Sequence, residues 1–282
     1  MSYRIDESNV NNEEFPQEIT ELNWNVPHIK IPDDFRNVLI LYASFSRLKS
    51  LKGISVVKKV NKLMLKGNKF SCLRDLSNFV NLTFLDISEN KILDLKHLNK
   101  LSNLQHLSSS SNEINLTNEV FSKKLTHLNL RSNKIVSVVC ICDLFNLTFL
   151  DLSYNQIQDL FPISQLINLN SLTFDNNQVQ NTDFLIKLIN LTFLSFTNNQ
   201  IENLEGLRSL ENLTMLCCGE NKISCLFPIC SLFKIRVLCC EKNLIQNVLC
   251  LKNLKLKNFV YNGNPLNQES KIFAKEIKFN PF

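Results

Sequence analysis

The chain has 282 residues, of which 44% are hydrophobic and 20% are charged, so it can bury a sizeable core and does not have the composition of a disordered chain. A net charge of +5 is too mild to indicate nucleic-acid binding. Its apolar runs are shorter than the roughly 20 residues that a membrane span requires, so we expect no membrane segment. Ten cysteines without a signal-peptide pattern favour reduced thiols in a cytoplasmic and/or nuclear protein.

The first residues of the chain are polar. Residues 1–17 carry scattered charges and no long apolar stretch, which predicts a polar N-terminal tail. A weak strand with apolar residues at Ile19, Leu22 and Trp24 follows, and a degenerate repeat comes after it, with Val38 and Leu41 in apolar positions. We therefore expect a repeat solenoid over residues 18–266, with about 11 repeats and the first ones degenerate.

The solenoid prediction rests on a phrase that recurs. NLTFLDLSYNQI at residues 146–157 reappears almost unchanged at 81–92 and 190–201. The wider pattern L-x-x-L-x-L-x-x-N-x-I/L recurs every 21 or 22 residues, and its asparagines are Asn68, Asn90, Asn112, Asn133, Asn155, Asn177, Asn199, Asn221, Asn243 and Asn264. Ten units in register are not a coincidence, and each one predicts a single supersecondary unit stacked on its neighbours.

Two apolar periods alternate inside each unit. Leu150 and Leu152 flank Asp151 as in a short strand with one buried face. After the asparagine, Ile157, Leu160 and Ile163 recur every third residue, which suits 3₁₀ or extended turns better than an α-helix. The fold class we predict is an α/β repeat solenoid with a parallel sheet on its concave side and 3₁₀ or extended turns on its convex side.

The repeated asparagine predicts a structural ladder. Its amide can both donate to and accept from backbone groups that would otherwise be buried without partners. A catalytic residue is needed once, whereas this asparagine occurs in every unit. The Asn-Leu-Thr triplets, which begin at Asn81, Asn115, Asn146, Asn190 and Asn212, are interpreted in the same way, as part of the repeat and not as glycan acceptors.

The end of the chain predicts a cap. GNPL stops the repeat pattern, and residues 267–282 contain a short amphipathic run that predicts a helix. Asn267 can cap this helix at its N-terminus. Ile272, Phe273 and Ile277 are then expected to cover the open edge of the last strand.

The sequence contains no catalytic motif, so we expect a non-enzymatic protein without a cofactor or metal. The four histidines and the serines lack a nucleophile context such as G-x-S-x-G. Cysteines gather late in the chain, where Cys217 and Cys239 fall in outward positions of neighbouring strands and Cys218 and Cys240 in inward ones. Their alternation argues against a four-cysteine zinc site, but it leaves oxidation or capture of a soft metal open as an alternative.

What remains is a surface. The positions that flank the buried strand residue face the concave side and include several aromatic and charged residues, the composition of a protein-binding face. The predicted contacts are Phe84, Asp86, His106, His127, Arg131, Phe149, Asp151, Tyr154, Asp175 and Phe193. The alternative is that the phenylalanines only shield the strand edges.

The repeats resemble leucine-rich repeats of the 22-residue subclass. Residues 57–92, VKKVNKLMLKGNKFSCLRDLSNFVNLTFLDISENKI, and the closing GNPL are similar to the leucine-rich regulatory subunit of protein phosphatase 1 and, more distantly, to internalins. This resemblance implies an intracellular protein that binds its partner on the concave face, which agrees with the protein-binding scaffold or adaptor that the surface columns predict, and we expect it to be monomeric when unbound. A phosphatase catalytic subunit is the more specific partner that it implies, and a cysteine-based metal or redox-responsive protein is a further alternative.

Overall fold

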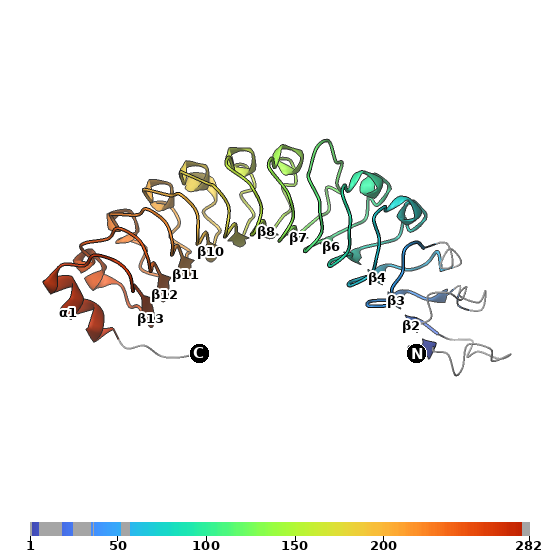
Figure 1. Ribbon diagram of the computed structural model, residues 1–282, viewed down its shortest axis with the longest axis horizontal. Coiled ribbons are helices and arrows are strands. Elements are labelled where there is room, and N and C mark those ends of the chain that lie inside the picture. Colours follow the sequence, from blue (N-terminus) through green and yellow to red (C-terminus); the bar gives the residue numbers. More distant parts are fainter. Residues whose placement is uncertain (1, 6–18, 25–34, 36, 52–56, 278–282) are drawn as a thin grey trace. The chain divides into compact units, whose positions relative to one another are not determined.

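The computed structural model describes residues 2–5, 19–24, 35, 37–51 and 57–277. The chain divides into two compact units, residues 1–134 (unit 1) and residues 135–282 (unit 2). Both units repeat one pattern, in which a short strand is followed by a turn that leads to the next strand (Figure 1). The predicted α/β repeat solenoid with a parallel sheet and 3₁₀ turns is therefore confirmed.

Unit 1 carries its strands in chain order, each paired in parallel with the next. They are β1 (Ser2–Ile5), β2 (Glu21–Trp24), β3 (Ile40–Tyr42), β4 (Lys62–Met64), β5 (Phe84–Asp86), β6 (His106–Ser108) and β7 (His127–Asn129). Two of its turns are the 3₁₀ helices η3 (Arg74–Asn78) and η4 (Lys96–Lys100).

Unit 2 continues the same arrangement with parallel pairs from β8 to β13. Its strands are β8 (Phe149–Asp151), β9 (Ser171–Thr173), β10 (Phe193–Ser195), β11 (Met215–Cys217), β12 (Val237–Cys239) and β13 (Asn258–Val260). Its 3₁₀ helices are η5 (Val139–Ile141), η6 (Phe161–Ile163), η7 (Asp183–Lys187), η8 (Glu205–Leu207), η9 (Phe227–Ile229) and η10 (Leu249–Asn253), and the α-helix α1 (Gln268–Glu276) follows. No helix in the described ranges is long and apolar enough to cross a bilayer.

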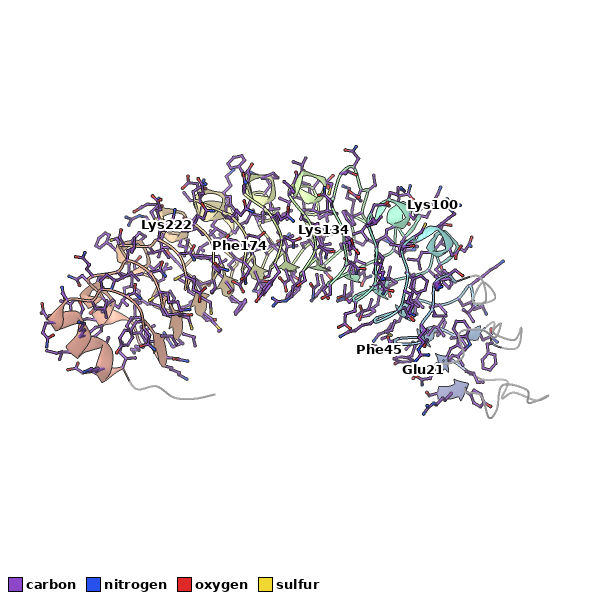
Figure 2. The ribbon with its side chains drawn as sticks, in the orientation of Figure 1. Glu21, Phe45, Lys100, Lys134, Phe174 and Lys222 are labelled. Carbon is purple, nitrogen blue, oxygen red and sulfur yellow. The ribbon has the colours of Figure 1, made fainter. Side chains whose placement is uncertain are left out.

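The core of each unit lies between its strands and its turns. The central residue of each three-residue strand is buried, as at Leu85 and Leu172, while the flanking residues face away from the core. The residues that recur every third position, such as Ile157 and Leu160, are also buried. Phe174 lies in the interior of unit 2 (Figure 2). Its ring stacks on that of Phe196, with the two ring centroids 5.4 Å apart.

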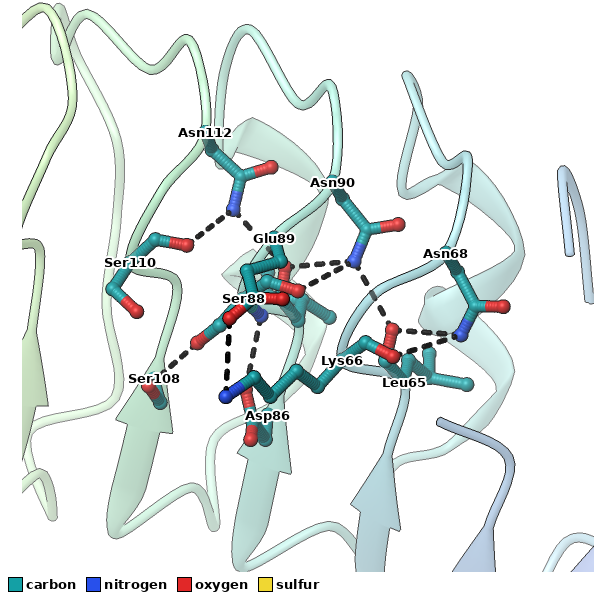
Figure 3. A network of polar contacts seen from close by, with 11 residues as sticks. Leu65, Lys66, Asn68, Asp86, Ser88, Glu89, Asn90, Ser108, Ser110 and Asn112 are labelled. Atoms are coloured by element: carbon teal, nitrogen blue, oxygen red, sulfur yellow. Dashed lines mark hydrogen bonds and ion pairs between the residues drawn. The ribbon is translucent and has the colours of Figure 1, made fainter. Parts of the chain in front are cut away.

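The asparagine ladder joins neighbouring repeats through buried backbone groups. Asn90 Oδ1 accepts the backbone N–H of Phe70 in the preceding repeat at 3.0 Å. Its Nδ2 donates to the carbonyl of Leu65 in that repeat at 3.1 Å and to the carbonyl of Ile87 in its own at 3.0 Å (Figure 3). Asn68 and Asn112 repeat this geometry beside it. One side chain thus satisfies groups in two turns that water does not reach.

A left-handed residue directly precedes each ladder asparagine. Gly67 and Gly263 occupy this position in the first and last of these repeats, with φ of 69° and 78°. Residues with side chains occupy it elsewhere, with φ between 51° and 58°: Glu89, Ser111, Ser132, Tyr154, Asn176, Asn198, Glu220 and Lys242. None of these is β-branched, because β-branched residues tolerate this conformation worst.

The N-terminal prediction needs a correction. Residues 1–17 were expected to be a tail, but Ser2–Ile5 form β1 and pair with β2 in register from Ser2 opposite Glu21. The weak strand that we expected at the end of the solenoid is therefore covered by another strand. Residues 6–17 lie outside the described part of the chain.

The C-terminal helix also differs from the expectation in its packing. Asn267 caps it, accepting the backbone N–H of Ser270 at 2.8 Å. The residues of the helix that are buried are Ser270 and Ala274, and the Ser270 hydroxyl accepts the N–H of Val248 at 3.1 Å. Ile272, expected to cover the strand edge, is 56% exposed. Ser270 and Ala274, one helical turn apart, form the face of α1 that packs against η10, and Ile272 lies on the opposite face of the helix.

The left-handed position makes a prediction about Ser111, an exposed residue with φ of 54°. Ser111→Gly removes the Cβ that this conformation disfavours and should leave the free energy of unfolding within about 1 kcal/mol of the wild type. Ser111→Val should lower it by about 1–2 kcal/mol or more. Urea denaturation of the two variants checks this, and equal midpoints would contradict the assignment.

The ladder makes a second prediction. Asn177→Ala leaves the buried N–H of Ile157 without its acceptor and removes one of the two asparagine donors from the carbonyls of Leu152 and Phe174, so it should cost about 2–4 kcal/mol of unfolding free energy. Asn190→Ala is the matched control, because Asn190 makes an exposed bond to the carbonyl of Ile167, and its loss should cost under about 1 kcal/mol. Similar costs for both variants in urea denaturation would show that burial of the ladder bonds is unimportant.

Candidate protein-binding face

The face of each sheet that points away from the core is built from two columns of side chains. From β4 to β7 in unit 1 and from β8 to β12 in unit 2, the first column consists of the residues that begin the strands, and the second of those that end them. In unit 1 the first column is Lys62, Phe84, His106 and His127, and the second is Met64, Asp86, Ser108 and Asn129. In unit 2 the first is Phe149, Ser171, Phe193, Met215 and Val237, and the second is Asp151, Thr173, Ser195, Cys217 and Cys239.

The first column of unit 1 forms a stack of rings. The centroids of Phe84 and His106 lie 5.8 Å apart and those of His106 and His127 lie 4.2 Å apart, with the rings tilted by less than 30°. The Lys62 ammonium lies 4.8 Å from the Phe84 centroid, a cation–π distance. Phe84, His106 and His127, three of the predicted contacts, are thus brought together. Lys62 was not among them, although its position in the same column of the repeat marks it.

The electrostatics of this stack favour a neutral imidazole. Partial burial, the neighbouring His127 and the Lys62 ammonium together lower the pKa of His106 from its ordinary value of 6.5. A proton on His106 would be placed beside other groups that carry or can accept positive charge. The stack is therefore held best when His106 is neutral.

The predicted acidic contacts Asp86 and Asp151 also stabilise the backbone. Asp86 Oδ1 accepts the N–H of Ser88 at 2.9 Å, and Asp151 Oδ1 accepts the N–H of Ser153 at 2.9 Å. Asn129 makes the same bond to Arg131 at 3.0 Å. These short-range turns follow β5, β7 and β8, a role that the sequence analysis missed although an Asp or Asn at the strand end signals it. Each carboxylate keeps a second oxygen for a partner.

Unit 2 presents a more apolar first column. Phe149, Phe193 and Met215 are partly exposed and flank buried strand centres, so they face away from the core. Phe193 is in register with Ser171 on one side and Met215 on the other. Ser171 lies between the two phenylalanines in this column.

Asp175 and Tyr154 occupy different surroundings in this unit. Asp175 Oδ1 accepts the hydroxyl of Ser195 at 2.6 Å and the N–H of Thr197 at 2.7 Å, so this carboxylate is held at the strand ends. Tyr154 is the left-handed residue before Asn155 and its side chain is 47% exposed. It therefore lies in the turn beyond β8 and not in either column.

Four of the five Asn-Leu-Thr triplets directly precede strands, where they form a second, exposed ladder, whereas the triplet at Asn115 lies in the turn between β6 and β7. Asn81 Nδ2 donates to the carbonyl of Lys58 at 3.2 Å, and Asn190 and Asn212 donate in the same way to carbonyls of the preceding repeat at 2.9 and 3.0 Å. The hydroxyls of Thr83 and Thr214 also donate to carbonyls in that repeat. Both polar residues of these triplets thus hold neighbouring repeats together.

The late cysteines lie in unit 2 as their alternation predicts. Cys218 and Cys240 are completely buried, whereas Cys217 and Cys239 are partly exposed and in register on β11 and β12. All ten cysteines are thiols in the described part of the chain. That part also contains no group of three or more His, Cys, Asp or Glu residues arranged to hold a metal ion.

Comparisons with known proteins agree with this geometry. A family model described as Leucine Rich repeats (2 copies) matches residues 145–187 and 189–231. The structure of an internalin, InlF, from Listeria monocytogenes is similar to this chain, with a TM-score of 0.81 and 26% identity, over 85% of this chain and 78% of that one. No curated protein sequence matches the chain.

Two further solved structures share the fold. One is a leucine-rich repeat protein of Leptospira interrogans, with a TM-score of 0.80 and 22% identity, over 94% of this chain and 79% of that one. The other is the plant peptide hormone receptor RGFR1 in complex with RGF2, with a TM-score of 0.74 and 21% identity, over 93% of this chain and 46% of that one. The fold is thus a leucine-rich repeat solenoid.

The His106 environment predicts a dependence of stability on pH. Because the pKa of His106 is lower in the folded protein than in the unfolded chain, the unfolded chain takes up the proton first as the pH falls below 6.5. Stability should therefore fall from that pH downward until folded His106 is also protonated. His106→Phe keeps a ring in the stack without a titrating group, and its urea midpoint should fall less than that of the wild type between pH 7.5 and 5.5. An equal fall would contradict this role.

Proposed function

We propose that the protein is a non-catalytic binding scaffold that holds another protein on the face of its sheets that points away from the core, the core-distal face. The observation that carries the proposal is the first column of unit 2, where Phe149, Phe193 and Met215 stand partly exposed on strands whose centres are buried. Aromatic and methionine side chains supply a large contact area on protein-binding surfaces.

The variation of residues along the repeats supports this role. Core leucines and ladder asparagines recur from repeat to repeat because the fold needs them in every repeat. The two columns instead vary along the repeats, for example from Lys62 through Phe84 to His106 in unit 1. Residues that vary while the backbone repeats are not required for stacking, and they give each part of the face its own chemistry.

The charges on the face add to its specificity. The face of unit 1 carries Lys62, and Lys66 pairs with Glu89 at 3.1 Å. The corresponding strand ends of unit 2 carry Asp175 and Glu241. A partner that contacts unit 2 should therefore present apolar anchors flanked by basic residues, because opposite charges steer association and exclude wrong partners. A protein of the same fold, the plant peptide hormone receptor RGFR1, was solved in complex with RGF2.

The more specific partner is a phosphatase catalytic subunit of the protein phosphatase 1 type. The resemblance of residues 57–92 to the regulatory subunit supports this choice, and the proposal includes a cytoplasmic and/or nuclear location and a monomer when unbound. The binding contacts in this proposal are the residues predicted from the sequence, Phe84 and His106 among them in unit 1 and Phe149 and Phe193 in unit 2. The turn position of Tyr154 puts it at the margin of the face.

Site-specific photo-crosslinking tests the binding face. A photoreactive phenylalanine analogue at Phe193, on the face, should form adducts with a partner in cells, whereas the same analogue at Phe161 should not. Phe161 is the matched control because it is a phenylalanine of the same unit that lies in η6 and is 67% exposed. Adducts from Phe161 alone would overturn the assignment of the face.

A measurement of binding affinity separates the two levels of the proposal. Purified phosphatase catalytic subunit should bind the wild type and lose at least tenfold in affinity for Phe149→Ala/Phe193→Ala, since aromatic anchors contribute about 1–2 kcal/mol or more each. Phe161→Ala/Phe227→Ala, with two exposed phenylalanines of the turns, is the control. If adducts form at Phe193 but the catalytic subunit does not bind, the scaffold stands and the phosphatase is the wrong partner.

A further inference from the structure

Two cysteines face each other across neighbouring strands of unit 2. Cys217 ends β11 and Cys239 ends β12, and the two residues are register partners in a parallel pair. Neighbouring strands lie about 4.8 Å apart, and the Cα atoms of disulfides are about 4.4–6.8 Å apart. The backbone of this pair therefore already has the separation that a disulfide needs.

The alternation of the strands makes this pair different from the cysteines beside it. Cys218 and Cys240 follow directly in sequence, but their side chains point into the core and are completely buried. Cys217 and Cys239 are on the other face and are partly exposed. An oxidant in solution can therefore reach Cys217 and Cys239 but not the buried cysteines.

The two thiols are also chemically unequal. A hydrogen bond from Cys217 lowers the pKa of Cys239, against the opposing effects of burial and of Glu241. The same hydrogen bond, together with burial, raises the pKa of Cys217. The thiolate is the nucleophile in sulfur chemistry, so Cys239 is suited to react first and Cys217 to follow.

We propose that Cys217 and Cys239 are a reversible oxidation site that closes to a disulfide across β11 and β12 when a hydroperoxide reaches this face. The Cys239 thiolate attacks hydrogen peroxide, the O–O bond breaks, and the leaving hydroxide takes a proton to become water, which leaves a sulfenic acid on Cys239. The Cys217 sulfur then attacks the Cys239 sulfur. The S–S bond forms, the S–O bond breaks, and the second oxygen leaves as water with the Cys217 proton.

The electrons of the reaction balance. Two thiols lose two electrons to form the disulfide, and one hydrogen peroxide gains them to form two molecules of water. A dithiol reductant reverses the step by thiol–disulfide exchange. This inference does not depend on a binding partner, although the bond would change the sheet face beside Met215 and Val237.

Peptide mapping of the full chain tests the proposal. The purified protein is treated with hydrogen peroxide, remaining thiols are alkylated, and the digest is analysed without reduction. The wild type should yield a cross-linked pair of peptides, one with Cys217 and one with Cys239, two hydrogen masses lighter than the separate peptides and separated again by a dithiol.

Variants identify the sulfurs, because each peptide also contains a buried cysteine. Cys217→Ser and Cys239→Ser replace partly exposed side chains and should each lower the yield of the cross-link at least tenfold. Cys218→Ala and Cys240→Ala are the matched controls on the core face and should keep it. Circular dichroism verifies that each variant is folded, and if one core variant does not fold, the other serves.

Two results would overturn the proposal. One is the persistence of the cross-link in folded Cys217→Ser or Cys239→Ser. The other is its absence from the wild type at a peroxide concentration that already converts Cys217 or Cys239 to sulfinic acid.

Discussion

The structure depends on how buried backbone groups are satisfied where the chain leaves each strand. At this bend the carbonyls and N–H groups of two neighbouring turns are removed from water, and a single asparagine side chain bonds to both turns. Asn177 shows the arrangement in unit 2, where its oxygen accepts the N–H of Ile157 and its nitrogen donates to the carbonyls of Leu152 and Phe174. An aspartate could not donate and an aliphatic residue could do neither, so the repeat permits little else at this position.

The spacing of the ladder also sets the register of the strands. Because each asparagine bonds at a fixed offset into the preceding repeat, the leucines of successive strands lie side by side and their neighbours all face away from the core. The left-handed residue before each asparagine turns the chain into the position where these bonds form. The residues that maintain the fold are thus confined to the core and the bend. The core-distal face is left to residues that can differ in each repeat.

The sequence predicted what is repeated better than what occurs once. The period, the buried leucines and the three-residue spacing of the turns follow directly from apolar patterning, and the structure confirms the fold that they indicate. The strand Ser2–Ile5 was missed because its pairing depends on the open edge of β2 and not on a pattern of its own. Ile272 was misplaced because the rotation of the helix about its axis, which turns Ser270 and Ala274 toward η10, depends on tertiary packing. The residues in the left-handed position are of several types, among them serine, glutamate and tyrosine, so residue type alone does not predict this conformation.

The candidate face shows the same limit. Its columns were predicted from strand alternation, but the interactions within them depend on which residues meet across strands. The stack of Phe84, His106 and His127 was foreseeable only in part, because ring orientation and the position of Lys62 are set by packing. The backbone bonds of Asp86 and Asp151 mean that these carboxylates both end strands and face a partner. Loss of either residue would therefore change stability as well as binding.

Hydrogen exchange of backbone amides in the native protein tests the central claim most directly. The N–H groups that the ladder oxygens accept in unit 2, at Ile157, Val179, Ile201 and Ile223, should exchange as slowly as the N–H groups of the buried strand centres. The account requires this because both sets open only when neighbouring repeats separate. If these four amides exchange as fast as those of the exposed turns, the asparagine ladder does not hold the repeats together.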